Sequence, residues 1–307
     1  MNNASLHDYM NIGIVQFMIY PQCFNGDGPI LETVSSLIED DFFDFLELGP
    51  IKSAEVRKQV TSIMSQAGVS VEFDGQPATL IPGLSLESAI KAEQTRAIDA
   101  MKVAIDQAAE FSSPSCGVMS GKLYPADLNQ QEALQRLRDA LIELCEYAAQ
   151  YNITLCLENF DQVPYSKDCL VGPTSMAAKV AREVREQTPN FGLLPDLSHT
   201  PILDETPFQM IEAANGLIIR TQIGNASTNP YSSHYGDNHP YFGAPLTNVG
   251  IDQLTEFLQS LVNIGYLSRD CKGKVGFEVK PSSGESSLAI IAGSKRALKA
   301  AWKRVDL

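Results

Sequence analysis

The sequence lacks several features that would place it in other classes of protein. It contains no run of about 18 apolar residues, so we expect no membrane span. Its start, MNNASLHDYMNIGIVQF, has no basic segment leading into an apolar one and does not predict a secretory signal. The six cysteines include no C-x-x-C pair, and several lie in apolar segments. This usage is typical of reduced, structural thiols in a cytoplasmic protein.

Positive charge and nucleotide-binding motifs are also scarce. Lys and Arg total 23 against 37 Asp and Glu, for a net charge of -14. Binding to nucleic acid depends on neutralising phosphates with Lys and Arg, so the composition argues against it. No G-x-G-x-x-G follows the first apolar segment, and no G-x-x-x-x-G-K-[ST] occurs anywhere. No linker, charge block or low-complexity tract divides the chain, so we expect a single domain over residues 1–307.

What the sequence does contain is a regular alternation of short apolar segments with longer amphipathic ones. Helical stripes run through residues 129–151, 173–187 and 251–265. The expected strands are residues 11–17, 43–48, 68–73, 116–121, 153–159, 191–197, 216–223 and 274–279. Eight such βα units predict an α/β fold of the (β/α)8 TIM-barrel type, and an open doubly wound sheet is the competing architecture.

Acidic residues stand at the ends of several expected strands. Glu158 ends the fifth strand, Asp196 the sixth and Glu278 the eighth. In a barrel these ends surround one mouth, where carboxylates at close range repel one another and a divalent cation removes the conflict. The alternative is that each acid caps the next helix or pairs with a neighbouring Arg or Lys.

The residue types at these ends indicate which metal is bound. Glu158, Asp196 and Glu278 offer carboxylate oxygens, and Gln222 on the seventh strand would offer an amide oxygen. A set of oxygen ligands favours Mn²⁺ or Mg²⁺ over Zn²⁺. His199, one turn beyond Asp196, is either a further ligand or a donor to a substrate hydroxyl.

Several segments together resemble a known family. These segments are LCLENFD (155–161), LLPDLSHTP (193–201), IIRTQIGN (218–225), DNHPYFGAP (237–245) and VGFEVKP (275–281). In their order and spacing they resemble the xylose-isomerase-like barrels. That group includes sugar isomerases and epimerases and also endonuclease IV, a member of AP endonuclease family 2. The resemblance covers essentially the whole chain.

The resemblance implies roles for matching residues. Glu158 and Glu278 would each be a metal ligand and an acid/base group, and Asp196 would be a ligand. His199 would contact substrate. The residue two before the GN of the seventh strand is usually a histidine ligand in this family, and here it is Gln222, which leaves this ligand open.

The long loop between residues 224 and 250 carries a D-x-H element. Asp237 and His239 resemble the pair that holds an additional zinc in endonuclease IV. A trinuclear zinc site is nevertheless not expected, because none of the four histidines lies near the third or fourth strand. We expect Asp237 and His239 to orient substrate or to close a lid over it. A hydrogen-bonded pair within the loop is the alternative.

These residues predict a metal-dependent sugar isomerase or epimerase that removes a proton next to a carbonyl. A metal would stabilise the enediolate that forms, with Glu158 and Glu278 as base and acid. Two groups on opposite faces give epimerisation and a single base gives isomerisation, and the sequence does not decide between them. The alternatives are a metal-dependent dehydratase of an inositol- or sugar-derived ketone and a catalytically inactive binding barrel, for which Gln222 is the best argument.

Three cations near the expected mouth bear on the substrate. Lys122, Arg220 and Lys280 could bind a phosphate group, or they could neutralise the acids. We expect a small sugar or polyol as partner, and neither nucleic acid nor a membrane. Because apolar helical faces on the outside of barrels often pair, a homo-oligomer is an open alternative.

Overall fold

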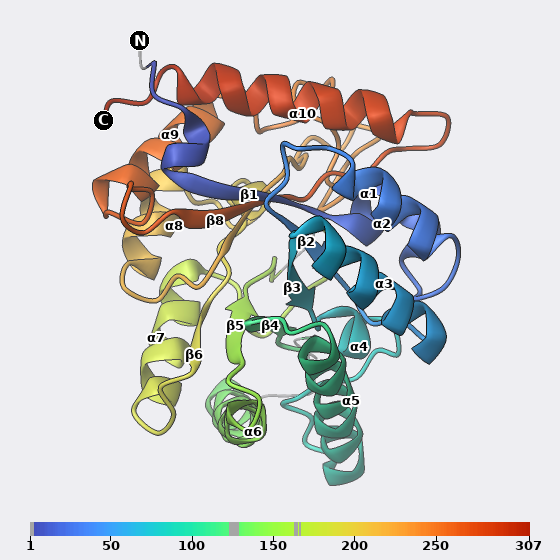
Figure 1. The fold of residues 1–307 in the computed structure, drawn as a ribbon. Coiled ribbons are helices and arrows are strands. Elements are labelled where there is room, and N and C mark those ends of the chain that lie inside the picture. The colour runs from blue at the N-terminus through green and yellow to red at the C-terminus, as the bar shows by residue number, and fades with distance from the viewer. Residues whose placement is uncertain (1–2, 123–128, 163–164, 166) are drawn as a thin grey trace.

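The strands of the protein form a closed parallel barrel. A computed structural model describes residues 3–122, 129–162, 165 and 167–307. Within these residues, one eight-stranded sheet has the order β6-β5-β4-β3-β2-β1-β8-β7. Its two edges meet through parallel bridges between Leu193 and Ile218 and between Asp196 and Gln222. The predicted (β/α)8 barrel is therefore confirmed (Figure 1).

Each expected strand overlaps an observed one. The strands are β1 (Met10–Val15), β2 (Phe45–Leu48), β3 (Ser70–Asp74), β4 (Ser115–Met119), β5 (Thr154–Glu158), β6 (Phe191–Leu193), β7 (Thr221–Ile223) and β8 (Gly273–Phe277). Two, β6 and β7, are less than half as long as predicted. β6 stops before Pro195, which has no N–H to donate to the ladder. The chain before β7 is in a turn at Gly216, where φ is 76°, and it contacts β6 only through a bridge.

Helices surround the barrel on its outside (Figure 1). The α-helices are α1 (Gln16–Ile19), α2 (Ile30–Ile38), α3 (Ala54–Ala67), α4 (Pro77–Leu80), α5 (Lys91–Glu110), α6 (Gln130–Ala149), α7 (Thr174–Arg185), α8 (Pro207–Ala214), α9 (Ile251–Asn263) and α10 (Ser287–Trp302). Short 3-10 helices are η1 (Leu6–Asp8), η2 (Pro21–Cys23) and η3 (Leu197–His199). Local sequence sets their ends: α8 begins at a capping box formed by Thr206 and Gln209.

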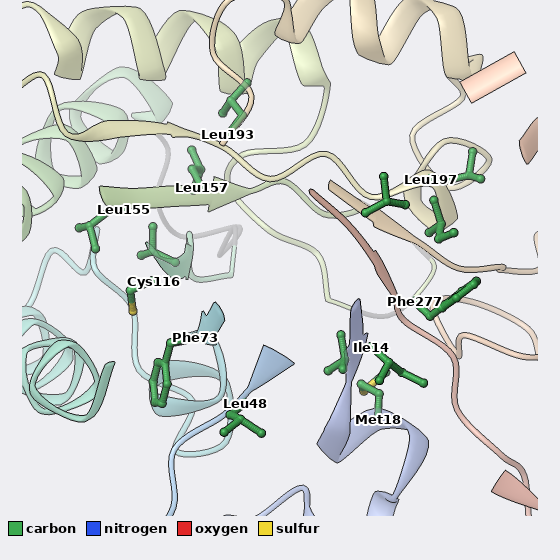
Figure 2. Close-up of a cluster of buried hydrophobic side chains, with 14 of the residues drawn as sticks. Ile14, Met18, Leu48, Phe73, Cys116, Leu155, Leu157, Leu193, Leu197 and Phe277 are labelled. Carbon is green, nitrogen blue, oxygen red and sulfur yellow. The ribbon is translucent and has the colours of Figure 1, made fainter. Parts of the chain in front are cut away.

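The two faces of each strand serve different purposes. On β2, Leu46 and Leu48 belong to the large hydrophobic cluster, which fills the space between the sheet and the helices (Figure 2). Glu47 lies between them in sequence and therefore points the other way, into the barrel. The interior of the barrel consequently receives polar side chains, which the functional site uses.

The cysteines form no disulfide bonds. All six cysteines are free, and only Cys271 is exposed. None of the helices in the described ranges is both long and apolar enough to cross a membrane.

Candidate active site

A cavity of about 160 Å³ opens at the carboxyl ends of the strands. Its apolar lining consists of Phe17, Met18, Phe24, Pro77, Leu80 and Phe160. Its polar lining consists of Asp74, Gln76, Glu158, Lys167, Gln222, Asp237, His239, Glu278 and Lys280. An apolar wall facing a few convergent polar groups is typical of a small-molecule site.

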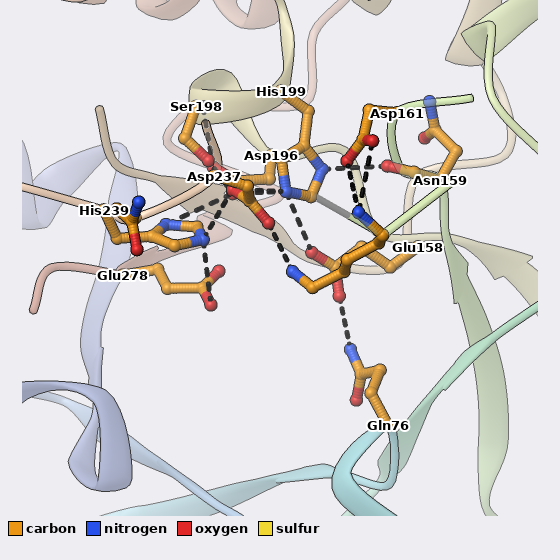
Figure 3. A network of polar contacts seen from close by, with 12 residues as sticks. Gln76, Glu158, Asn159, Asp161, Asp196, Ser198, His199, Asp237, His239 and Glu278 are labelled. Carbon is orange, nitrogen blue, oxygen red and sulfur yellow. Dashed lines mark hydrogen bonds and ion pairs between the residues drawn. The ribbon is translucent and has the colours of Figure 1, made fainter. Parts of the chain in front are cut away.

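Three of the predicted ligands converge beside this cavity. Glu158, Asp196 and Glu278 each offer a carboxylate oxygen within 4.8 Å of the other two. Glu158 is the last residue of β5 and Glu278 directly follows β8. Asp196 caps η3, where it accepts hydrogen bonds from the backbone N–H of Ser198 at 2.9 Å and from the Ser198 hydroxyl. Figure 3 shows the three acids facing one another.

Burial and mutual repulsion change the acidity of this cluster. Burial raises the pKa of Glu158 to about 7, although nearby His199 acts against this, and Asp196 adds to the rise. Burial also raises the pKa of Glu278 well above its ordinary value, with repulsion from Asp196 and Glu158 adding to the effect. Two carboxyls that can hold a proton near neutral pH are suited to acid/base work.

The donor atoms of this cluster fit a divalent cation. Glu278 Oε2 and Gln222 Oε1 are buried without a hydrogen-bond partner among the described residues. Gln222 lines the same cavity and is the backbone partner of Asp196 across the β6–β7 closure. Buried acceptors are almost always satisfied, so unpaired oxygens of residues that line the same cavity as these carboxylates indicate a place for a cation. Glu158, Asp196, Glu278 and Gln222 would hold it.

The loop pair Asp237 and His239 reaches the same cavity. Asp237 Oδ1 lies 2.8 Å from His239 Nε2 and 3.3 Å from His199 Nε2. The two residues contact each other, and His239 also lies near Asp196 and Glu278, so a role in orienting substrate stays a prediction. His239, His199 and Asp196 form a second group with donor atoms within 4.8 Å of one another.

His199 is oriented by the backbone. Its Nδ1 lies 2.8 Å from the carbonyl oxygen of Asn159, so Nε2 faces Asp237 and Asp196. Burial lowers the pKa of His199, but the charges of Asp237 and Asp196 outweigh this and raise it to about 9. The imidazole is thus a hydrogen-bond donor toward the cavity near neutral pH.

Lys167 is a site residue that the sequence analysis missed. Its ammonium group contacts Asp237 and lies 4.2 Å from the centre of the Phe160 ring. Burial disfavours its charge, yet Asp237 and Glu158 together raise the pKa of Lys167. Burial likewise opposes the charge of Asp237, but His239 and Lys167 hold its pKa well below the ordinary value. Lys167 follows β5 in a loop, where no periodic pattern signals that a side chain turns inward.

Gln76 was also missed, although it directly follows the EFDG segment of β3. Its amide nitrogen donates to Glu158 Oε2 at 2.7 Å and so orients that carboxylate. Gly117 makes room for it, because a Cβ at this position would lie 2.3 Å from Gln76 Oε1. A glutamine next to a glycine-containing turn is the only signal that the sequence offers.

A second set of buried acids, of which only Asp74 also lines the cavity, is paired with cations. Arg220 is wholly buried and donates to Glu47, to Asp74 and, at 3.2 Å, to the carbonyl of Phe73. Lys274 pairs in the same way with a glutamate of β3, Glu72. We call this set the lower layer: Arg220, Glu47, Asp74, Lys274 and Glu72.

The predicted substrate cations lie in different places. Arg220 belongs to the lower layer and does not line the cavity, which corrects its assignment as a substrate contact: the acids of β2 and β3 occupy its guanidinium. Lys122 is exposed and lines a neighbouring cavity. Lys280 is half-buried and does line the cavity that holds the glutamates.

Fold and site together define a barrel with an acidic mouth suited to a divalent cation. A model of the xylose isomerase-like TIM barrel family matches residues 38–300, so the chain belongs to this family. The family predicted from the sequence motifs is thereby confirmed. The curated proteins searched include none that matches this chain.

Solved structures with the same fold carry the names of sugar epimerases. A D-tagatose 3-epimerase-like protein is 18% identical, with a TM-score of 0.73 over 97% of this chain and 100% of the other. L-Ribulose 3-epimerase is 18% identical, with a TM-score of 0.74 over 96% of each chain. A 3-keto-D-glucoside 4-epimerase from E. coli is 17% identical, with a TM-score of 0.69 over 96% of this chain and 99% of the other. At these identities the likeness shows a shared fold.

Proposed function

We propose that this protein is a divalent-metal-dependent sugar epimerase or isomerase that removes a proton next to a carbonyl. The carrying observation is that Glu158 and Glu278 face one cavity, with pKa values raised by burial and with Asp196 beside them. The metal expected is Mn²⁺ or Mg²⁺, because the four ligands offer oxygen. When bound, it would polarise a substrate carbonyl and offset developing negative charge.

Glu158 and Glu278 would transfer the proton. They enter the cavity from β5 and β8, which are separated around the barrel by β6 and β7. A carboxylate on one side can take a proton from one face of a ketose, and a carboxylic acid on the other side can return one to the opposite face. This arrangement supports epimerisation over isomerisation. It agrees with the names of the structural neighbours, which also suggest a ketose-type substrate.

The remaining polar groups would orient the substrate. His199 donates from Nε2 when it is protonated, and Asp237 accepts from substrate or from His239. Lys167 would bring positive charge close to the developing enediolate, since its charge already acts on Glu158. The wall formed by Phe17, Leu80 and neighbouring residues would shield the reacting carbons from water.

Hydrogen exchange in D₂O tests the proposal. With Mn²⁺ and a panel of ketoses, the protein should exchange the hydrogen next to the carbonyl and form an epimer. Glu158→Gln and Glu278→Gln should each abolish exchange, whereas Glu285→Gln, an exposed acid before α10, should leave it unchanged.

Other outcomes would select the alternatives. Loss of water from an inositol- or sugar-derived ketone, in place of epimer formation, would identify a dehydratase. A folded protein that neither holds nor responds to Mn²⁺, and that exchanges no hydrogen, would be the catalytically inactive barrel.

A further inference from the structure

Gln222 connects the lower layer to the carboxylate cluster. Its amide nitrogen donates to Glu47 Oε2 at 2.8 Å. Its amide oxygen is buried and has no partner in the part of the chain that the structure describes. The side chain lines the cavity that also contains Glu158 and Glu278, and its backbone pairs with Asp196. The amide nitrogen is thus held by Glu47, and the amide oxygen is left without a partner among the described residues in a side chain that lines the cavity.

The charge of Glu47 determines which way this amide points. An ionised carboxylate only accepts hydrogen bonds, so it attracts the amide N–H and repels the amide oxygen. Arg220 donates to the same carboxylate oxygen and holds the Glu47 side chain in place. Reversing the amide would bring two acceptors together and point N–H groups at the acidic cluster.

The space around Glu47 allows it little movement. Glu47 is wholly buried. Gly276 on β8 lies against it, and a Cβ at that position would stand 1.6 Å from Glu47 Oε1. Arg220 is itself held by Asp74 and by the Phe73 carbonyl. The orientation of Gln222 is therefore imposed by a rigid set of neighbours.

We propose that Glu47 is a positioning residue that acts through Gln222. It turns the amide oxygen toward the cation that Glu158, Asp196 and Glu278 would hold. This inference rests on the proposed function and deepens it. The position would otherwise offer a ring nitrogen, as in the proteins that the chain resembles, and the amide makes the set all-oxygen. The site should then prefer Mn²⁺ or Mg²⁺ to Zn²⁺.

Metal affinity of the full chain tests the inference without measuring turnover. Mn²⁺ binding is titrated by electron paramagnetic resonance for the unmodified protein, Gln222→Met, Glu47→Gln and the double variant. Each single variant should bind Mn²⁺ about 10–100-fold more weakly, the range typical of lost support around metal ligands. Glu47→Gln has this effect because the amide N–H that it introduces can donate to the Gln222 oxygen, which releases the imposed orientation.

The double variant separates a positioning role from a structural one. If Glu47 acts through Gln222, the double variant should bind Mn²⁺ no more weakly than Gln222→Met alone. Additive losses would mean that Glu47 affects the site by another route and would overturn the inference. Unchanged Mn²⁺ affinity in Glu47→Gln would also overturn it.

Two further variants serve as a control and as an alternative measurement. Gln94 is a buried glutamine outside the cavity that donates to the Leu86 carbonyl, and Gln94→Met should bind Mn²⁺ normally. If Glu47→Gln does not fold, Gln222→His provides the measurement, because its ring N–H can still donate to Glu47. The ratio of Zn²⁺ to Mn²⁺ affinity should rise in Gln222→His, and an unchanged ratio would contradict the inference.

The outcomes distinguish this inference from the proposed function. If the unmodified protein binds Mn²⁺ and exchanges hydrogen while both single variants bind Mn²⁺ normally, only the inference fails. If the unmodified protein binds no Mn²⁺, both fail.

Discussion

The barrel holds buried acids in two regions that differ in their partners. In the lower layer, Glu47 and Asp74 contact Arg220, and Glu72 contacts Lys274. At the mouth, Asp237 contacts Lys167, whereas Glu158, Asp196 and Glu278 form no ion pair with a Lys or Arg within the described ranges and have only His199 and His239 beside them. Buried charge is costly unless it is paired, so these three acids are the candidates for binding a cation.

Removing a charge should also affect stability differently in the two regions. Removing a partner in the lower layer leaves a buried charge alone, which destabilises the protein. Removing charge at the mouth relieves repulsion, so the fold should tolerate it while function is lost. Substitutions, metal binding and pH can each test this difference.

The largest effect is expected from Glu158→Gln or Glu278→Gln. Hydrogen exchange should fall by about 10²–10⁴-fold, the usual contribution of a general acid or base. The free energy of unfolding of the metal-free protein should stay the same or increase, because a repelling charge is gone. Exchange rates in D₂O and urea unfolding of the same samples measure both. A variant that loses stability together with activity would show that the carboxylates at the mouth also stabilise the fold.

The next largest effect is expected from Arg220→Met. It should lower the free energy of unfolding by about 3–5 kcal/mol, since Glu47 and Asp74 would be left buried without a cation. Arg304→Met is the control, because the side chains of Arg304 and its partner Asp252 are 50% and 77% exposed. That loss should be about 0–1 kcal/mol. Equal urea midpoints for the two variants would show that the lower layer is not structural.

Bound Mn²⁺ should stabilise the protein only through the carboxylates at the mouth. At free Mn²⁺ one hundred times its dissociation constant, unfolding should cost about 2.7 kcal/mol more than after treatment with a chelator. Asp196→Asn should abolish this gain. Thermal unfolding with and without Mn²⁺ provides the measurement, and a gain that survives in Asp196→Asn would place the cation elsewhere.

The smallest effect is a pH dependence of the metal-free protein. The pKa of Glu158 is raised to about 7 in the folded state, so folding is progressively opposed as pH rises from its ordinary pKa of 4.5 through 7. The pKa of His199 is raised from 6.5 to about 9, so its contribution is present below pH 6.5 and lost toward 9. Both groups predict lower stability at pH 8 than at pH 5.5.

A variant without the Glu158 carboxyl tests this pH dependence. Glu158→Gln removes the carboxyl that titrates, so its stability should depend less on pH between 5.5 and 7. Urea unfolding across that range compares the two proteins. An equally steep fall in the variant would assign the effect to other groups.

Much of the fold and part of the site could be predicted from local patterns. Apolar segments with a period of two mark the strands, and the acids at their ends mark the mouth, because parallel strands bring those ends together. Glu158, Asp196 and Glu278 were found in this way. Lys167 and Gln76 were not, since both lie beyond strand ends in segments without periodicity, and their inward direction depends on the loops.

By itself, the sequence determined the barrel, its family and the three carboxylates at its mouth, because these follow from periodicity and from the order of elements along the chain. Only the tertiary structure decided which acids have cations. Arg220 contacts Glu47 across 173 positions in the sequence, a distance over which no local pattern operates. That contact removed Arg220 from the list of substrate contacts and, in our proposal, orients the amide of Gln222 through Glu47.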